Sequence, residues 1–185
     1  MPGFRLRFPS SGELVSERPT LLVAINLASD PEAVCLQAAG LARRMGARVV
    51  LLHAAQLPVG LAADAPVRPP GASEPVSAAE MLHQDALRHL DPLLDLMRMH
   101  GADVELDLRR GRVVDQVVAA AAALDPLMLI VGSDLPSGLR RLFLGSVTED
   151  LIHAVDVPVL VVKGDPNAAG VLSTGQMQAA AENDG

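Results

Sequence analysis

The feature that most constrains the fold is a regular alternation between short apolar runs and longer amphipathic stretches. Five runs of strand length recur along the chain, at residues 20–25, 48–54, 103–108, 127–131 and 157–162. Most of them are almost continuously apolar, as strands covered on both faces are, whereas residues 103–108 alternate between charged and apolar side chains. Strands that alternate with helices form parallel sheets with helices on both faces. The sequence therefore predicts a three-layer α/β/α domain built on a five-stranded parallel sheet.

Local signals place helices between these strands. Asp30 followed by a proline is typical of a helix start. Capping boxes at residues 77–80 and 146–149 predict the starts of two further helices, and apolar spacing predicts another at about 113–124. Pro92 lies inside the helix that starts at the capping box 77–80, and it predicts a kink or a break in that helix.

The order of the strands locates the candidate site. Right-handed crossover connections allow the strand order 3-2-1-4-5, in which the chain reverses direction between strands one and four. Ligands of such sheets bind at the carboxyl ends of the strands at that point, where residues 26–29 meet the loop that starts at Gly132. That loop ends at a helix N-terminus, which favours an anion. Gly145 and Ser146 either offer an amide and a hydroxyl to a phosphate or serve only as a turn and an N-cap.

The chain divides into three parts. Residues 1–18 form an N-terminal arm, residues 19–163 the domain, and residues 164–185, which contain few apolar side chains, a tail that is expected to be disordered. Residues 4–8 of the arm alternate as a strand does, and we expect them to pack rather than remain free. The proline-rich connection at 56–76 is expected to be a functional flap or a disordered connector.

Composition excludes several classes of partner. Lys+Arg 15 against Asp+Glu 22 gives a net charge of −7, and three Phe with no Trp or Tyr offer no base-stacking platform, so nucleic-acid binding is disfavoured. No apolar stretch approaches the length that spans a membrane. A single cysteine and the lack of an apolar run near the N-terminus predict a cytoplasmic protein.

The search for catalytic and metal patterns gives little. The sequence contains neither the G-x-G-x-x-G motif of dinucleotide-binding proteins nor a Walker-type P-loop. It also lacks the G-x-S-x-G nucleophile elbow. His83 and His89 are six residues apart, which places them on different faces of a helix and argues against a zinc pair. His53 is expected to have a structural role rather than to contact a ligand, and Cys35 to be a buried, unreactive thiol. Without a nucleophile paired with a base, we expect neither enzyme activity nor a metal site.

The two edge strands of the predicted sheet differ, and the difference predicts a homodimer. The third strand carries charges at alternate positions, which discourage pairing along its edge. The fifth strand, from Val157 to Val162, carries no charge, and Pro158 is its one protection against edge pairing. A two-fold axis would pair this strand with its own copy, unless the tail after Lys163 folds back over the edge.

The loop between the fourth strand and the last helix carries a family resemblance. Gly132 is followed by Gly145 and Ser146 at the spacing glycine, two residues, glycine, nine residues, glycine, serine or threonine, with Leu135 at the second glycine position. Further similarity lies in Leu51-Leu52-His53, Val147-Thr148-Glu149 and the last strand. From about residue 20 to residue 162 the chain resembles the universal stress protein family, whose nucleotide-binding members carry this motif.

The resemblance implies a nucleotide-binding-like fold, similar to that of adenine nucleotide alpha hydrolases, and a dimer through the last strand. It also implies ATP or AMP as the ligand, although no cofactor is assigned from the residues themselves. Asn26 would contact base or ribose, and the further candidates carried over by position are Val49 against the adenine, Gly132 near the ribose, and Gly145, Ser146, Val147 and Thr148 around the phosphates.

Two departures from the family pattern weaken the case for a triphosphate. Asn26 stands where ATP-binding members usually have an aspartate, which removes a charge that could help to hold a metal–phosphate complex. Leu135 adds a side chain where a glycine backbone would face the phosphates. Arg140 and Arg141 are alternative sources of positive charge, or a solvated pair in the loop.

Three functions remain open from the sequence. The favoured one is a regulatory stress-response protein that acts through partner contacts and has a degraded nucleotide site. The second is a universal stress protein that binds ATP or AMP and senses energy state. The third, a slow ATPase or hydrolase, is disfavoured because a general base and a metal carboxylate are missing at the usual place.

Overall fold

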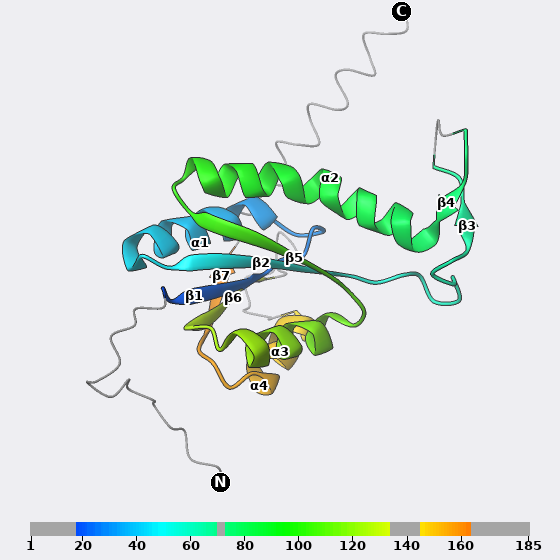
Figure 1. The fold of residues 1–185 in the computed structure, drawn as a ribbon. Coiled ribbons are helices and arrows are strands. Elements are labelled where there is room, and N and C mark those ends of the chain that lie inside the picture. Colours follow the sequence, from blue (N-terminus) through cyan, green and yellow to red (C-terminus); the bar gives the residue numbers. More distant parts are fainter. Residues whose placement is uncertain (1–17, 70–72, 134–144, 164–185) are drawn as a thin grey trace, which may run out of the picture.

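The structure, a computed structural model, describes residues 18–69, 73–133 and 145–163. These residues form three layers, with a parallel sheet between two pairs of helices (Figure 1). The strands of the sheet are β1 Thr20–Ala24, β2 Arg48–Ala55, β5 Asp103–Arg110, β6 Met128–Ser133 and β7 Val159–Lys163. The helices are α1 Pro31–Met45 and α2 Ala78–Met99 on one face, and α3 Val113–Leu124 and α4 Ser146–Ala154 on the other.

The predicted topology is confirmed. The strand order is β5-β2-β1-β6-β7 with every pairing parallel, which is the expected order 3-2-1-4-5 once two short strands outside the sheet are set aside. Val23 in the middle of β1 pairs with Leu51 of β2 on one side and with Ile130 of β6 on the other. The carboxyl ends of these three strands therefore lie together.

The continuous apolar sequence of β1 follows from burial on both faces of the sheet. Successive side chains of a strand point to opposite faces. Leu21 and Val23 pack with α1 and α2, whereas Leu22 and Ala24 pack with α3 and α4. Two hydrophobic clusters thus hold the layers together, and the central strand contributes to both.

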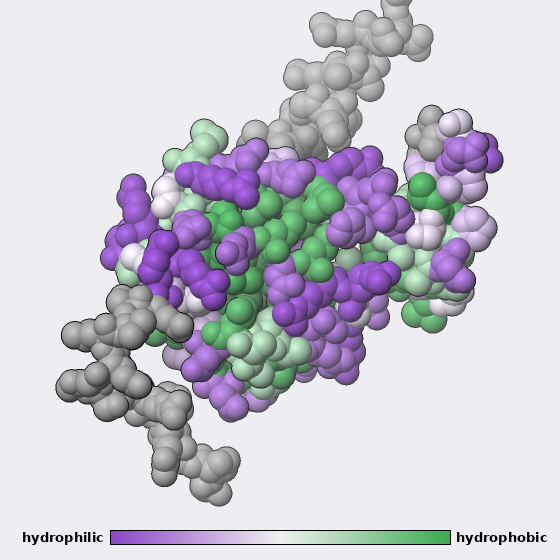
Figure 2. Space-filling view, in the orientation of Figure 1, coloured by the Kyte–Doolittle hydropathy of each residue, from purple (hydrophilic) through white to green (hydrophobic). Residues whose placement is uncertain are grey.

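Figure 2 shows the side of the molecule on which β5 forms the edge of the sheet. Hydrophilic side chains cover much of this face, with apolar ones visible between them. In the described part of the chain, no helix combines the length and the apolar character needed to cross a membrane.

The helix boundaries are set by the expected capping residues at α1 and α2. The Asp30 side chain accepts a hydrogen bond from the backbone N–H of Ala33, at 3.2 Å, and α1 ends where Gly46 adopts a positive φ of 62°. The Ser77 hydroxyl oxygen accepts one from the N–H of Glu80, at 3.1 Å.

Two expectations about helices differ from the structure. Of the kink or break expected at Pro92, the break does not occur, since α2 runs as one helix from Ala78 to Met99 (Figure 1). Pro92 is exposed, so water can satisfy the carbonyl that loses its helical partner. Ser146 is the first residue of α4 rather than its N-cap, a position that Gly145 takes. Its hydroxyl therefore does not cap the helix.

The connection at 56–76 contains regular structure that the sequence reading missed. β3, Pro66–Val67, pairs antiparallel with β4, Val76–Ser77, and this hairpin leads directly into α2. The hairpin lies beyond the end of the sheet, beside the start of α2 (Figure 1). The last strand also differs, since β7 begins at Val159 and follows Pro158, which lacks an N–H for the ladder.

Several expectations lie outside the described residues. They are the packing of the N-terminal arm up to residue 17, the disorder of the tail from residue 164, and the roles of Leu135, Arg140 and Arg141.

Candidate functional site

A pocket of about 160 Å³ opens at the carboxyl ends of β1, β2 and β6. This is the place predicted from the reversal of chain direction in the sheet. Its apolar wall consists of Ala24, Ile25, Pro31, Val34, Leu52, Ala54, Val113, Val131, Val147 and Leu151. The remaining lining residues are Asn26, Ser29, His53, Gly132 and Thr148. The strand order predicted that Asn26 and Gly132 would lie close together, and both residues line this pocket.

Asn26 shapes the loop between β1 and α1. Its side-chain Oδ1 accepts a hydrogen bond from the backbone N–H of Ala28, at 3.0 Å, which forms an Asx turn. The Ser29 hydroxyl donates to the backbone carbonyl of Asn26, also at 3.0 Å. The carboxamide thus helps to fold its own loop, and it gives the pocket no negative charge.

Gly132 marks a close approach between β6 and α1. A Cβ atom built on Gly132 would lie 3.1 Å from Val34 Cγ2 and 4.0 Å from Ser29 Oγ. The first distance is tighter than ordinary van der Waals contact, so a side chain would displace Val34 or enter the pocket. The glycine therefore keeps this part of the site open.

Thr148 joins the start of α4 to the end of β6. Its side chain is buried, with 4% of the residue exposed, and its hydroxyl donates to the Gly132 carbonyl at 3.2 Å. The hydroxyl proton is thereby committed to a protein carbonyl. This hydrogen bond holds the first turn of α4 against the end of β6.

The N-terminus of α4 lies at the rim of the pocket. Val147 and Thr148, in its first turn, line the pocket, whereas Gly145 and Ser146 do not. The first turn of a helix carries backbone N–H groups without intrahelical partners and a partial positive charge. These groups are the part of the described site that suits an anion.

The structure does not bring Val49 to the pocket. Val49 is fully buried in the hydrophobic cluster beneath α1 and α2, and it pairs with Leu21 near the start of β1. At a rise of about 3.3 Å per residue, five residues separate it from Ala54 by roughly 16 Å. Ala54, at the carboxyl end of β2, is the residue of this strand that occupies the expected place.

Sequence reasoning also missed other lining residues. Val113 reaches the pocket from the start of α3 and Val34 from α1, whereas Ser29 belongs to the segment 26–29 that the strand order had already placed there. The signal that could have found Val113 is its place directly after β5, since helices that follow parallel strands begin at the same edge of the sheet.

Ionisable groups are scarce at the site. Of the residues that the structure places on the pocket wall, His53 alone has an ionisable side chain; it is half-buried, and its Nδ1 lies 3.2 Å from the Ile25 carbonyl oxygen. Cys35 is buried, as expected, and burial raises its pKa to about 12, with the charge of Glu32 as a smaller cause. Its thiol is protonated at neutral pH. Within the described ranges, no cluster of three side chains suits a metal ion.

Comparison with known proteins gives a consistent result. The model of the universal stress protein family matches residues 17–163. The stress response protein NhaX of Bacillus subtilis is 24% identical over 160 residues, which cover 77% of this chain and 96% of NhaX.

Solved structures agree. A universal stress protein from Archaeoglobus fulgidus is 26% identical with a TM-score of 0.59, and the comparison covers 79% of this chain and 98% of that one. The structure of the universal stress protein from Archaeoglobus fulgidus in complex with dAMP matches with a TM-score of 0.56 and 23% identity, over 79% and 98% of the two chains. Because the family model matches well over half of its length, the chain described here belongs to the universal stress protein family.

Proposed function

We propose that this protein is a regulatory universal stress protein that binds an adenine nucleoside monophosphate in the pocket at the carboxyl ends of β1, β2 and β6. The observation that carries the proposal is the pocket itself, an apolar space of about 160 Å³ beside a helix N-terminus. An apolar cavity of about 150 Å³ holds one aromatic ring. A purine base would fill the apolar part, and one phosphate would meet the N–H groups of α4.

The same lining supports weak binding of Mg-ATP. Mg²⁺ bound to a nucleotide is usually held by one or two carboxylates, and Asn26 supplies a carboxamide where the family pattern has an aspartate. The Asn26 oxygen already accepts the Ala28 N–H, and the Thr148 hydroxyl already donates to Gly132. On the described wall, few polar groups are therefore left to contact the second and third phosphates of ATP, so ATP should gain few contacts that AMP lacks.

Titration calorimetry tests this preference. AMP should bind, and Mg-ATP should bind no more tightly than AMP. Asn26→Asp keeps the acceptor for Ala28 and adds a carboxylate, so it should raise the affinity for ATP only when Mg²⁺ is present. Combining it with Leu135→Gly should raise that affinity further. Mg-ATP binding to the wild type ten times more tightly than AMP would contradict the proposal.

We also propose that the protein acts through binding rather than catalysis. Cys35 is buried and protonated, and the two hydroxyls that line the pocket together with His53, those of Ser29 and Thr148, both donate to backbone carbonyls. Incubation with ATP should release no phosphate above the rate of a control without protein. Stoichiometric turnover within hours would favour the ATPase alternative.

The proposed partner is a second copy of the chain, paired through β7. Leu160 in this edge strand is 41% exposed, and β7 carries no charge before Lys163. Exposed uncharged edges invite pairing with another strand. Light scattering should give about twice the chain mass, and Leu160→Lys should shift the protein toward monomer. Glu105→Gln on the opposite edge is the matched control, and a wild-type monomer at micromolar concentration would refute the interface.

A single buried thiol also suits a reducing compartment, so we propose a cytoplasmic location.

A further inference from the structure

A glycine in the middle of α1 is not required by the packing of the described chain. Gly40 lies inside the helix, where glycine is less stable than alanine because it loses more backbone freedom on folding. Its φ does not lie in the left-handed region. Beyond the backbone of its own helix, the nearest atom to an added Cβ would be Arg44 Nη2, at 3.7 Å, which is an ordinary contact. The space beside Gly40 is therefore open to a group from outside the chain.

Gly40 lies in a row of three residues along the outer side of α1. Residues four apart on a helix are neighbours on its surface, so Leu36 and Arg44 lie on either side of Gly40. Leu36 is 38% exposed. The Arg44 guanidinium lies beside Gly40, so this side chain turns toward the preceding turn and not toward the carbonyls at the end of the helix. The row thus presents an apolar side chain, an open backbone position and a positive charge.

Arg44 and its neighbour Arg43 have no carboxylate partner among the described residues. Six other arginines there do form ion pairs, at positions 18, 48, 88, 98, 109 and 112. Cations in the last turn of a helix offset its dipole, but other groups already satisfy the end of α1. The Gly46 N–H donates to the Ala42 carbonyl, and Arg18 donates to the Gly46 carbonyl at 3.4 Å. Both guanidinium groups are therefore available to a carboxylate from outside.

We propose that this α1 face, made of Leu36, Gly40, Arg43 and Arg44, docks an acidic helix of a protein partner. An apolar side chain of the partner packs between Leu36 and Gly40, and its carboxylates pair with the two arginines. Arginine binds carboxylates through two parallel hydrogen bonds, and a glycine lets another backbone approach closely. The inference goes beyond the proposed nucleotide site and does not depend on it.

The charge of the chain favours an acidic protein helix over a membrane as the occupant. Anionic lipids are typically recognised by clusters of about four to eight cations, whereas the α1 face has two. The net charge of −7 also repels an extended anionic surface. On a protein of this charge, two unpaired arginines give an acidic helix a defined place to bind and thereby fix its register.

Two synthetic helices that differ only in charge test the proposal. Both are stapled peptides with a leucine stripe, flanked by glutamates in one and by glutamines in the other, and fluorescence anisotropy measures their binding to the full chain. The glutamate peptide should bind with a Kd of about 100 μM or tighter, and about tenfold more tightly than the glutamine peptide. Its binding should weaken in 1 M NaCl, because the charges are exposed. No binding of the glutamate peptide at about 1 mM would overturn the proposal.

Variants of the α1 face separate docking from net charge. Gly40→Leu fills the open position with a good helix former, so it should raise Tm while it weakens binding of the glutamate peptide about tenfold. Arg44→Gln should also weaken binding about tenfold. Arg110→Gln is the matched control, because Arg110 is an exposed arginine without a described carboxylate partner but lies on β5. Equal losses in Arg44→Gln and Arg110→Gln would overturn the proposal, since net charge alone would then attract the peptide.

Two further measurements identify a different occupant. Vesicles of phosphatidylserine and phosphatidylcholine in equal parts should not sediment the protein. Sedimentation that Arg43→Gln abolishes would overturn the proposal in favour of a membrane. Light scattering should give the same mass for the wild type and for Gly40→Leu. A lower mass for the variant would place a second copy of the chain on the α1 face and would likewise overturn the acidic helix.

Discussion

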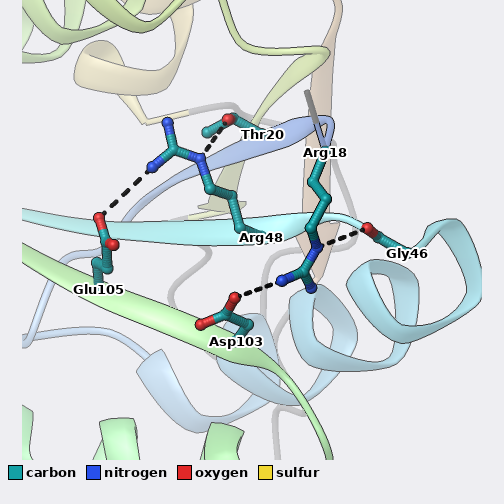
Figure 3. A network of polar contacts seen from close by, with 6 residues as sticks. All are labelled: Arg18, Thr20, Gly46, Arg48, Asp103 and Glu105. Carbon is teal, nitrogen blue, oxygen red and sulfur yellow. Dashed lines mark hydrogen bonds and ion pairs between the residues drawn. The ribbon is translucent and has the colours of Figure 1, made fainter. Parts of the chain in front are cut away.

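The two ends of the parallel sheet use polar side chains in opposite ways. At the amino-terminal ends of β1, β2 and β5, polar groups pair mainly with one another (Figure 3). Arg48 donates to the Thr20 hydroxyl at 2.9 Å and lies 3.6 Å from Glu105, while Arg18 donates to Asp103 at 2.7 Å. At the carboxyl ends, Asn26, Thr148 and His53 instead contact backbone groups around an open pocket.

This difference separates stability from ligand binding along the same strands. Arg48 links the strands on both sides of β2, since Thr20 lies on β1 and Glu105 on β5. Such contacts pair the polar side chains of the amino-terminal end with one another across three strands. At the other end each polar contact fixes one loop and leaves the apolar wall of the pocket uncovered. We therefore expect substitutions at the two ends to affect different measurements.

The largest expected effect follows from closing the pocket at Gly132. Gly132→Val would place side-chain atoms where the glycine approaches Val34, and it should weaken AMP binding by at least 100-fold. Crowding of this kind typically costs about 1–3 kcal/mol of unfolding free energy. Calorimetry with AMP and urea denaturation measure the two effects.

Gly40 provides the matched control for that substitution. It lies inside α1, and a Cβ there would meet only the end of the Arg44 side chain, at 3.7 Å. Gly40→Ala should stabilise the protein by about 0.5–1 kcal/mol and leave AMP binding unchanged. Normal AMP binding by a folded Gly132→Val protein would show that the ligand lies elsewhere.

The next effect concerns the contact between α4 and β6. Thr148→Val keeps the shape of the side chain but removes the hydroxyl that donates a hydrogen bond to the Gly132 carbonyl. Loss of this bond should lower the unfolding free energy by about 1–2 kcal/mol. Because the contact sets the position of the α4 N-terminus, AMP binding should weaken by about tenfold. Thr148→Ser keeps the hydroxyl and should lose less of both. Equal AMP affinity in the two variants would mean that the hydroxyl does not position the site.

The fold could be predicted from the sequence because its strongest signals are local or topological. Apolar runs, capping residues and the handedness of crossovers were enough for the strand order and for the helix starts at Asp30 and Ser77. The unbroken helix at Pro92 depends on exposure to water, which its immediate neighbours do not reveal. The β3–β4 pairing joins only two residues on each side, too few to produce a periodic signal.

The candidate site was predictable only in part. The ends of β1 and β6 followed from topology, which correctly brought Asn26 and Gly132 together. The structure places Val49 away from the pocket, because it is the second residue of β2 and only side chains near the carboxyl end of that strand reach the pocket. The amino-terminal contacts were not predicted at all, since pairing Arg48 with both Thr20 and Glu105 requires the register of three strands.

A smaller effect is expected at the amino-terminal end, and on stability alone. Arg48→Met keeps much of the aliphatic length but removes the hydrogen bond to Thr20 and the ion pair with Glu105. The unfolding free energy should fall by about 1 kcal/mol, and AMP affinity should stay within twofold of the wild type. A tenfold loss of AMP binding would mean that the two ends of the sheet are coupled.

The smallest expected effect belongs to the pair formed by Arg18 and Asp103. The 2.7 Å contact is short, yet the two side chains are 56% and 57% exposed, so water competes for both charges. Ion pairs of this kind contribute about 0.2–1 kcal/mol. A double-mutant cycle of Arg18→Met and Asp103→Asn should give a coupling energy within that range, reduced in 1 M NaCl, where the screening length falls to about 3 Å. Arg18 also donates to the Gly46 carbonyl at 3.4 Å, so Arg18→Met alone should destabilise slightly more than Asp103→Asn. AMP binding should not change in any member of the cycle. A coupling energy above about 2 kcal/mol would contradict the prediction, because it would exceed the contribution of an ion pair that is exposed to water.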